Sequence, residues 1–181
     1  MSFPPVVLQI VLVLLVAVAA VYDLRFRRIP NWLVLSGLLL GLALNTFLSQ
    51  WSGARVSLLG LILAFLIYFP LYLLRGMGAG DVKLMAAIGA IVGPSNWFGI
   101  FILSGLLGGV FAVLLLLARG KLGNSLWNIG FLFQRLFSFK APYAREELDL
   151  ASPKSVKLPH GVCIAAGSVL FLAGAWIWAP R

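Results

Sequence analysis

Long apolar runs alternate with short polar segments along the whole chain. A helix that crosses a bilayer core of about 30 Å needs roughly 20 residues, because each residue adds about 1.5 Å. The runs that meet or approach this length are residues 5–22, 32–49, 56–74, 82–92, 97–118 and 159–178. This pattern predicts an all-α integral membrane protein with about six transmembrane helices.

One further segment, residues 121–140, has a different pattern. Apolar side chains recur there at helical spacing, and most polar side chains fall on the other side. The apolar positions are Leu122, Leu126, Ile129, Phe133 and Phe137. Such a pattern predicts an amphipathic helix that lies in the cytoplasmic membrane interface. The chain shows no internal repeat, and we expect residues 1–181 to form a single membrane-embedded domain.

The basic residues indicate how these helices are oriented. If the loop after the first run is cytoplasmic, all but Arg55 and Arg181 of the 14 Lys and Arg residues lie on the cytoplasmic side. Cytoplasmic loops of membrane proteins carry such an excess. The distribution predicts that both termini lie outside, with cytoplasmic loops at residues 23–31, 75–81 and 119–158. The net charge of +9 then reflects orientation and does not indicate a nucleic-acid partner.

Composition narrows the chemistry further. The chain is 62% hydrophobic and only 10% charged, so a lipid bilayer must be part of its surroundings. The single cysteine, Cys163, cannot form an internal disulfide or a cysteine-rich zinc site. We interpret it as a small core residue; a nucleophile paired with His160 is the alternative. We expect no metal and no cofactor.

Two of the five acidic residues stand apart from the others. Glu146, Glu147 and Asp149 lie in a polar stretch that reads as a solvated linker. Asp23 ends the first apolar run, and Asp81 opens the short run 82–92. The predicted topology places both on the cytoplasmic side, where two helix ends can bring them together.

Asp81 and Asp23 are candidates for acid–base chemistry. From Asp81 to the turn that we expect at residues 93–96, the chain covers only about 18 Å as a helix. If this turn lies at the outer membrane surface, the Asp81 carboxylate lies below the inner one. A carboxylate at that depth is costly unless it faces a wet cavity or a partner. Two carboxylates at one site share a proton, because both cannot ionise cheaply. The ionised member can activate water, and the protonated member can polarise a peptide carbonyl. The alternative for Asp23 is a surface charge pair with Arg25 or Arg27.

The residues around Asp81 suggest supporting roles. Gly78 and Gly80 would let the chain turn sharply and let another backbone approach the aspartate; a plain flexible loop is the alternative. Lys83 either marks the inner face or tunes the pair, because a nearby cation favours ionisation.

These motifs resemble those of the type IV prepilin peptidase family of membrane aspartic peptidases. The matching stretches are residues 22–31 (YDLRFRRIPN) and 78–84 (GAGDVKL), the second of which contains the family's Gly-x-Gly-Asp signature. Pro159-His160-Gly161 also looks like the family's entry into its final helix. The resemblance implies that Asp23 and Asp81 are the catalytic pair.

The resemblance also implies a substrate and a location. The substrates would be prepilin-type precursors, cut on the cytoplasmic face of the inner membrane between a short basic leader and a hydrophobic helix. Pilus or secretion assembly components are possible further partners. The chain lacks the cysteine-rich region of the longer members, so we expect no N-methyltransferase activity. Its size is similar to the short branch that serves Flp/Tad-type pili, with the archaeal peptidases as the alternative.

Two other functions fit a membrane protein with these aspartates. A proton-coupled transporter could use them as proton carriers, although such groups usually lie near mid-membrane between inverted repeats. A non-catalytic membrane subunit of a secretion machine would need neither carboxylate.

Overall fold

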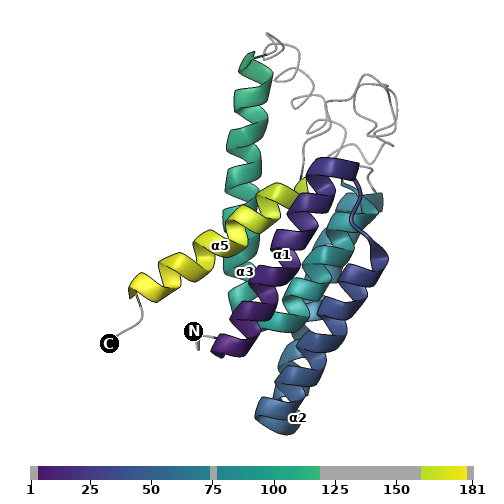
Figure 1. Ribbon diagram of the computed structural model, residues 1–181, viewed down its shortest axis with the longest axis vertical. Helices are drawn as coiled ribbons and strands as arrows, with labels where there is room; N and C mark the ends of the chain where they lie inside the picture. The colour runs from purple at the N-terminus through teal and green to yellow at the C-terminus, as the bar shows by residue number, and fades with distance from the viewer. Residues whose placement is uncertain (1–3, 74–76, 119–159, 179–181) are drawn as a thin grey trace, which may run out of the picture.

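Every element that the structure describes is an α-helix (Figure 1). The computed structural model describes residues 4–73, 77–118 and 160–178. The helices are α1 (Val6–Phe26), α2 (Asn31–Leu73), α3 (Ala79–Ala118) and α5 (His160–Trp178). Three of these are long and apolar enough to cross a membrane, and α5 contains a shorter apolar stretch. The prediction of an all-α chain with apolar, membrane-type helices is therefore confirmed for the described residues. The predicted interfacial helix at 121–140 lies outside them.

Helix α2 reverses direction near its middle. Ser49 and Gln50 leave helical geometry, and Gln50 has a φ of 51° and a ψ of −134°. Gly53 then lies so close to Asn45 that an added methyl group would overlap the Asn45 carbonyl oxygen. In a straight helix, residues this far apart in sequence are separated by about 12 Å. The chain therefore runs down and back, as Figure 1 shows, and the reversal falls at the end of the predicted run 32–49.

Helix α3 reverses in the same way at Gly93, which has a φ of 74° and a ψ of 172°. Across the reversal, the Trp97 indole Nε1 donates a hydrogen bond to the Met85 carbonyl at 3.1 Å. A straight helix would separate these two residues by roughly 18 Å. The sequence predicted a turn over residues 93–96, but only Gly93 leaves helical geometry, because proline fits the first turn of the helix that follows. That each arm of α2 and α3 crosses the bilayer stays a prediction.

The first arm of α3 is the centre of the bundle. Residues 84–93 are all buried, which explains why this segment is apolar all round. Both arms of α2 pack on it at glycines: Gly41 against the Ala90 backbone, and Gly60 against Gly89. In lipid, small residues of this kind let helix backbones approach closely. The close packing fixes the start of α3 relative to the rest of the bundle.

The outer faces of the helices are apolar and exposed. Large side chains there include Leu14, Leu39, Phe47, Leu66, Leu106 and Leu114. Water-soluble proteins rarely expose continuous apolar surface of this extent. The exposed side chains fit a lipid environment.

Candidate active site

Asp23 lies in the last turn of α1, and it is only 8% exposed. The helix continues past the predicted end at residue 22, because Arg27 adopts a left-handed conformation (φ 53°) and its N–H closes the helix on the Asp23 carbonyl at 3.0 Å. Arg25 lies in this last turn, where a cation is favourable. The apolar run predicted the membrane segment, whereas backbone hydrogen bonds determine where the helix ends.

The Asp23 carboxylate contacts the beginning of α5. The backbone N–H of Gly161 donates a hydrogen bond to Asp23 Oδ2 at 2.8 Å. A methyl group added at Gly161 would lie 3.0 Å from both Asp23 Cβ and Oδ2, so the two helices meet where a side chain would not fit comfortably. In the sequence, Gly161 stands out only as part of a helix entry. Its position directly after the start of the final helix was the signal for a backbone donor.

Asp81 is the third residue of α3 and is half-buried. Gly78 precedes the helix, and its carbonyl accepts the N–H groups of Asp81 at 3.1 Å and Val82 at 3.4 Å. Neither Gly78 nor Gly80 has a positive φ. A Cβ at Gly80 would lie 3.3 Å from Ile29 Cβ, in the segment between α1 and α2. In the structure, these glycines allow close approach instead of an unusual turn.

These elements bring the two carboxylates to the same end of the bundle. Asp23 and Asp81 are close enough for the charge of one to act on the other. From α5, His160 lies within electrostatic range of Asp23, and Cys163 lies within range of both carboxylates. The end of α1, the start of α3 and the start of α5 therefore lie near one another at this end of the bundle.

Lys83 lies beside this site without entering it. Its side chain is exposed, and Nζ donates a hydrogen bond to Asn31 Oδ1 at 3.0 Å, at the first residue of α2. This contact ties the start of α3 to the start of α2. The hypothesis that Lys83 tunes the pair stays a prediction.

Within residues 4–73, 77–118 and 160–178, no group of three His, Cys, Asp or Glu side chains could hold a metal ion. Glu146, Glu147 and Asp149 lie outside these residues. Asp23 and Asp81 are the acidic residues that the described part of the chain places at this end of the bundle. One of them can take a proton from water while the other donates a hydrogen bond to a carbonyl oxygen.

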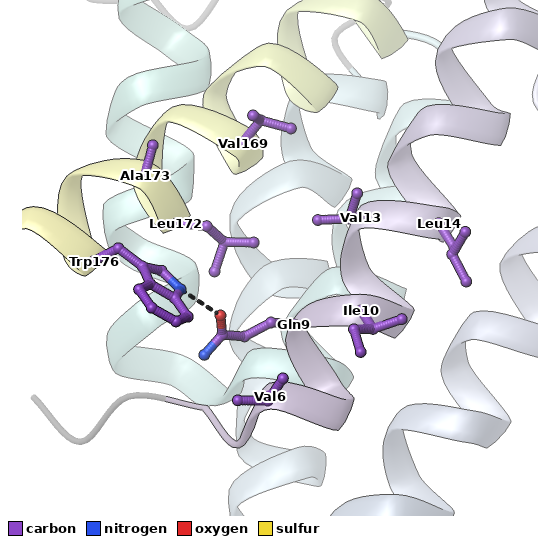
Figure 2. Close-up of a pocket in the computed structure, with 9 residues that line it drawn as sticks. All are labelled: Val6, Gln9, Ile10, Val13, Leu14, Val169, Leu172, Ala173 and Trp176. Carbon is purple, nitrogen blue, oxygen red and sulfur yellow. Dashed lines mark hydrogen bonds between the residues drawn. The ribbon is translucent and has the colours of Figure 1, made fainter.

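An apolar pocket of about 460 Å³ lies between α1 and α5, away from the carboxylates (Figure 2). At its edge, Trp176 Nε1 donates a hydrogen bond to Gln9 Oε1 at 3.0 Å. Gln9 is roughly 21 Å from Asp23 along α1 at 1.5 Å per residue. The pocket is separate from the candidate site, although α1 and α5 contribute to both.

Comparison with known proteins shows which family the chain is similar to. The profile of the type IV leader peptidase family matches residues 10–113, a range that includes both Asp23 and Asp81. No solved structure is significantly similar to the chain.

Several known proteins are also similar to the chain. A preflagellin peptidase of Methanocaldococcus jannaschii is 35% identical over 83 residues, which cover 44% of this chain and 35% of that protein. A prepilin leader peptidase/N-methyltransferase of Xanthomonas campestris pv. campestris is 32% identical over 114 residues, covering 59% of this chain and 39% of the relative. A preflagellin peptidase of Methanococcus voltae is 31% identical over 88 residues, covering 46% and 37%. The chain thus matches well under half the length of each relative.

Proposed function

The chain belongs to the type IV leader peptidase family, and from this premise we propose that it is a membrane aspartic endopeptidase that removes leaders from pilin-like precursors. The observation that supports the proposal is that Asp23, at the end of α1, and Asp81, at the start of α3, lie within electrostatic range of each other. The two residues are 58 positions apart in the sequence, and the helix ends that carry them lie on the same side of the bundle.

In the proposed reaction, the pair works with one shared proton. The ionised carboxylate takes a proton from a water molecule, whose oxygen then attacks the peptide carbonyl carbon. The protonated carboxylate donates a hydrogen bond to the carbonyl oxygen and stabilises the negative charge that develops there. As the carbon–nitrogen bond breaks, a proton passes to the leaving amine, and the pair returns to its starting state. Because Asp23 is buried and Asp81 is half-buried, bulk water has limited access to the two carboxylates.

The substrate class is proposed from the names of the relatives. These proteins are called prepilin leader peptidases and preflagellin peptidases. We extend this to prepilin-type precursors for the present chain, and the resemblance to the short branch favours precursors of Flp/Tad-type pili. Such a precursor carries a basic leader followed by a hydrophobic helix.

The proposed location is the cytoplasmic face of the inner membrane. Arg25 follows Asp23 closely in α1, and Lys83 follows Asp81 in α3, so basic residues flank both carboxylates. Basic residues are enriched on the cytoplasmic side of membrane proteins. We propose six crossings with both termini outside. Reporter fusions at the C-terminus and at Arg55 should report the outer side, and a fusion within residues 75–81 the inner side.

The activity is tested by co-expressing the chain with a prepilin-type precursor and following the size of the precursor on a gel. We expect membranes with the wild-type chain to produce a shorter product, and N-terminal sequencing to locate the cut just before the hydrophobic helix. Asp23→Asn and Asp81→Asn variants should leave the precursor intact although both are found in the membrane. An uncut precursor with the wild-type chain, across several pilin-type substrates, would overturn the proposed function.

A further inference from the structure

We propose that Gly161, at the start of α5, is a positioning residue for the catalytic pair: its N–H and its lack of a side chain hold the Asp23 carboxylate in its working orientation. This inference rests on the proposed peptidase function and adds α5 to the catalytic centre. The family profile ends at residue 113, well before this helix.

The contact itself is short, buried and directional. The Gly161 N–H donates to Asp23 Oδ2 at 2.8 Å, within the range of hydrogen bonds to charged acceptors. Gly161 is in the first turn of α5, where N–H groups have no partner within the helix and the helix dipole favours a negative charge. The hydrogen bond therefore satisfies a donor that the helix leaves open.

Asp23 needs an external support of this kind. It lies in the last turn of α1, a few residues before the helix ends at Arg27. Helix ends fray readily and hold their side chains loosely. A fixed donor on another helix restricts the carboxylate to one orientation, and the placement of catalytic groups within about 1 Å affects rates by roughly 100-fold.

Helix α5 can supply a fixed donor because it is anchored elsewhere along its length. Gly167 packs directly on Ser104 of α3, and a Cβ at Gly167 would lie 2.7 Å from the Ser104 backbone nitrogen. Gly99 of α3 receives the ring of Phe171 in the same way. These contacts attach α5 to the second arm of α3 and are separate from Asp23. The position of Gly161 is thus set by the bundle, and Asp23 adjusts to it.

The glycines of α5 offer matched variants. A methyl group at Gly161 would press on the Asp23 carboxyl, at 3.0 Å from Oδ2 and 3.2 Å from Cγ. A methyl group at Gly167 would press on Ser104 instead, and one at Gly174 would meet no atom of the described residues within 4 Å. Gly161→Ala tests displacement of the aspartate, and Gly174→Ala is the control for substituting a glycine of α5. Gly167→Ala tests whether α5 must be anchored on α3 to support the aspartate.

The test measures kcat and KM for cleavage of a synthetic precursor by the purified full-length protein in detergent. For Gly161→Ala we expect kcat per folded molecule to fall by about 10- to 100-fold while KM changes by less than about twofold. Gly174→Ala should match the wild type. Gly167→Ala should lower both the thermal midpoint and kcat, because its methyl group would displace the helix that carries Gly161; an unchanged kcat would contradict the anchoring of Gly161 by this contact. A wild-type kcat for Gly161→Ala would overturn the inference, as would a loss no larger than its loss of folded protein.

A second measurement tests the contact without using activity. If the Gly161→Ala methyl group presses on the Asp23 side chain, it should lower the thermal midpoint less in an Asp23→Gly protein, which lacks Cβ, Cγ and Oδ2, than in the wild-type protein. The wild-type protein must cut the precursor in the first assay for the proposed function to hold, whereas this comparison is independent of cutting. An equal loss in both proteins would overturn the contact, whatever the result for the function.

Discussion

The contact between Gly60 of α2 and Gly89 of α3 gives a sharp prediction about what holds the bundle together. A methyl group at either glycine would overlap the carbonyl oxygen of the other. The obstructing atom belongs to a helix backbone, so no side-chain rotation can relieve the overlap. In Gly60→Ala, α2 and α3 must therefore move apart. Their interface is the most extensive one between the described helices.

The cost follows from what this movement disturbs. Overpacking of a close-packed core destabilises proteins by about 1–3 kcal/mol, and occasionally by more. We expect Gly60→Ala at the upper end, near 3 kcal/mol, because residues 84–93 are buried on every side and each would lose contact. The buried hydrogen bond from Ser57 Oγ to the Ala90 carbonyl, at 2.7 Å, crosses the same interface and would lengthen.

The assay is an SDS titration of the purified protein, followed by tryptophan fluorescence. We expect a clearly lower unfolding midpoint for Gly60→Ala and for Gly89→Ala. The double variant should lose less than the sum of the two, because the first methyl group already separates the helices. Gly105→Ala and Gly109→Ala are the controls, since neither methyl group would lie within 4 Å of an atom in the part of the chain that the structure describes. A wild-type midpoint for Gly60→Ala would refute this account of the packing.

Three further predictions concern single residues. Gly93→Ala should lower the free energy of unfolding by about 1–3 kcal/mol, because the φ of 74° and ψ of 172° at this position suit only glycine. An added Cβ would also meet Val56 Cγ1 at 2.5 Å. An unchanged unfolding midpoint would contradict this prediction. Ser57→Ala should cost about 1 kcal/mol in the same titration, since the hydrogen bond to Ala90 is lost in an apolar setting, and a stabilised variant would argue against that contact. Lys83→Met should keep precursor cleavage within about twofold, as expected for an exposed polar contact. A pH profile that shifts in Lys83→Met would instead support the tuning hypothesis.

Sequence periodicity predicted the helices well because length and apolarity are properties of the segments themselves. The reversals at Ser49 and Gly93 fall where the apolar runs were expected to end. The helix bounds were less predictable: α1 continues to Phe26 because the left-handed Arg27 ends it through a backbone hydrogen bond. Such a contact depends on local geometry and leaves little trace in hydropathy.

The candidate site was predictable in part for a similar reason. Asp23 and Asp81 stood out because acidic residues at the edges of apolar runs are rare and costly. The contribution of Gly161 was not predictable in this way, because it acts through a backbone N–H and through the absence of a side chain. Only the packing of α5 against α1 shows that its N–H meets Asp23. Lys83, by contrast, lies two residues after Asp81 in the sequence, but its side chain donates a hydrogen bond to Asn31.

The central claim is that Asp23 and Asp81 act as one catalytic unit, and the most direct test is a comparison of cleavage rates. Wild type, Asp23→Asn, Asp81→Asn and the double variant would be purified and given the same synthetic precursor, after their SDS unfolding midpoints have shown that each is folded. We predict that each single variant loses about 10²- to 10⁴-fold in kcat/KM. The double variant should be no slower than the slower single variant, because residues that act as a unit are not additive. A single variant that cleaves at the wild-type rate would contradict the account.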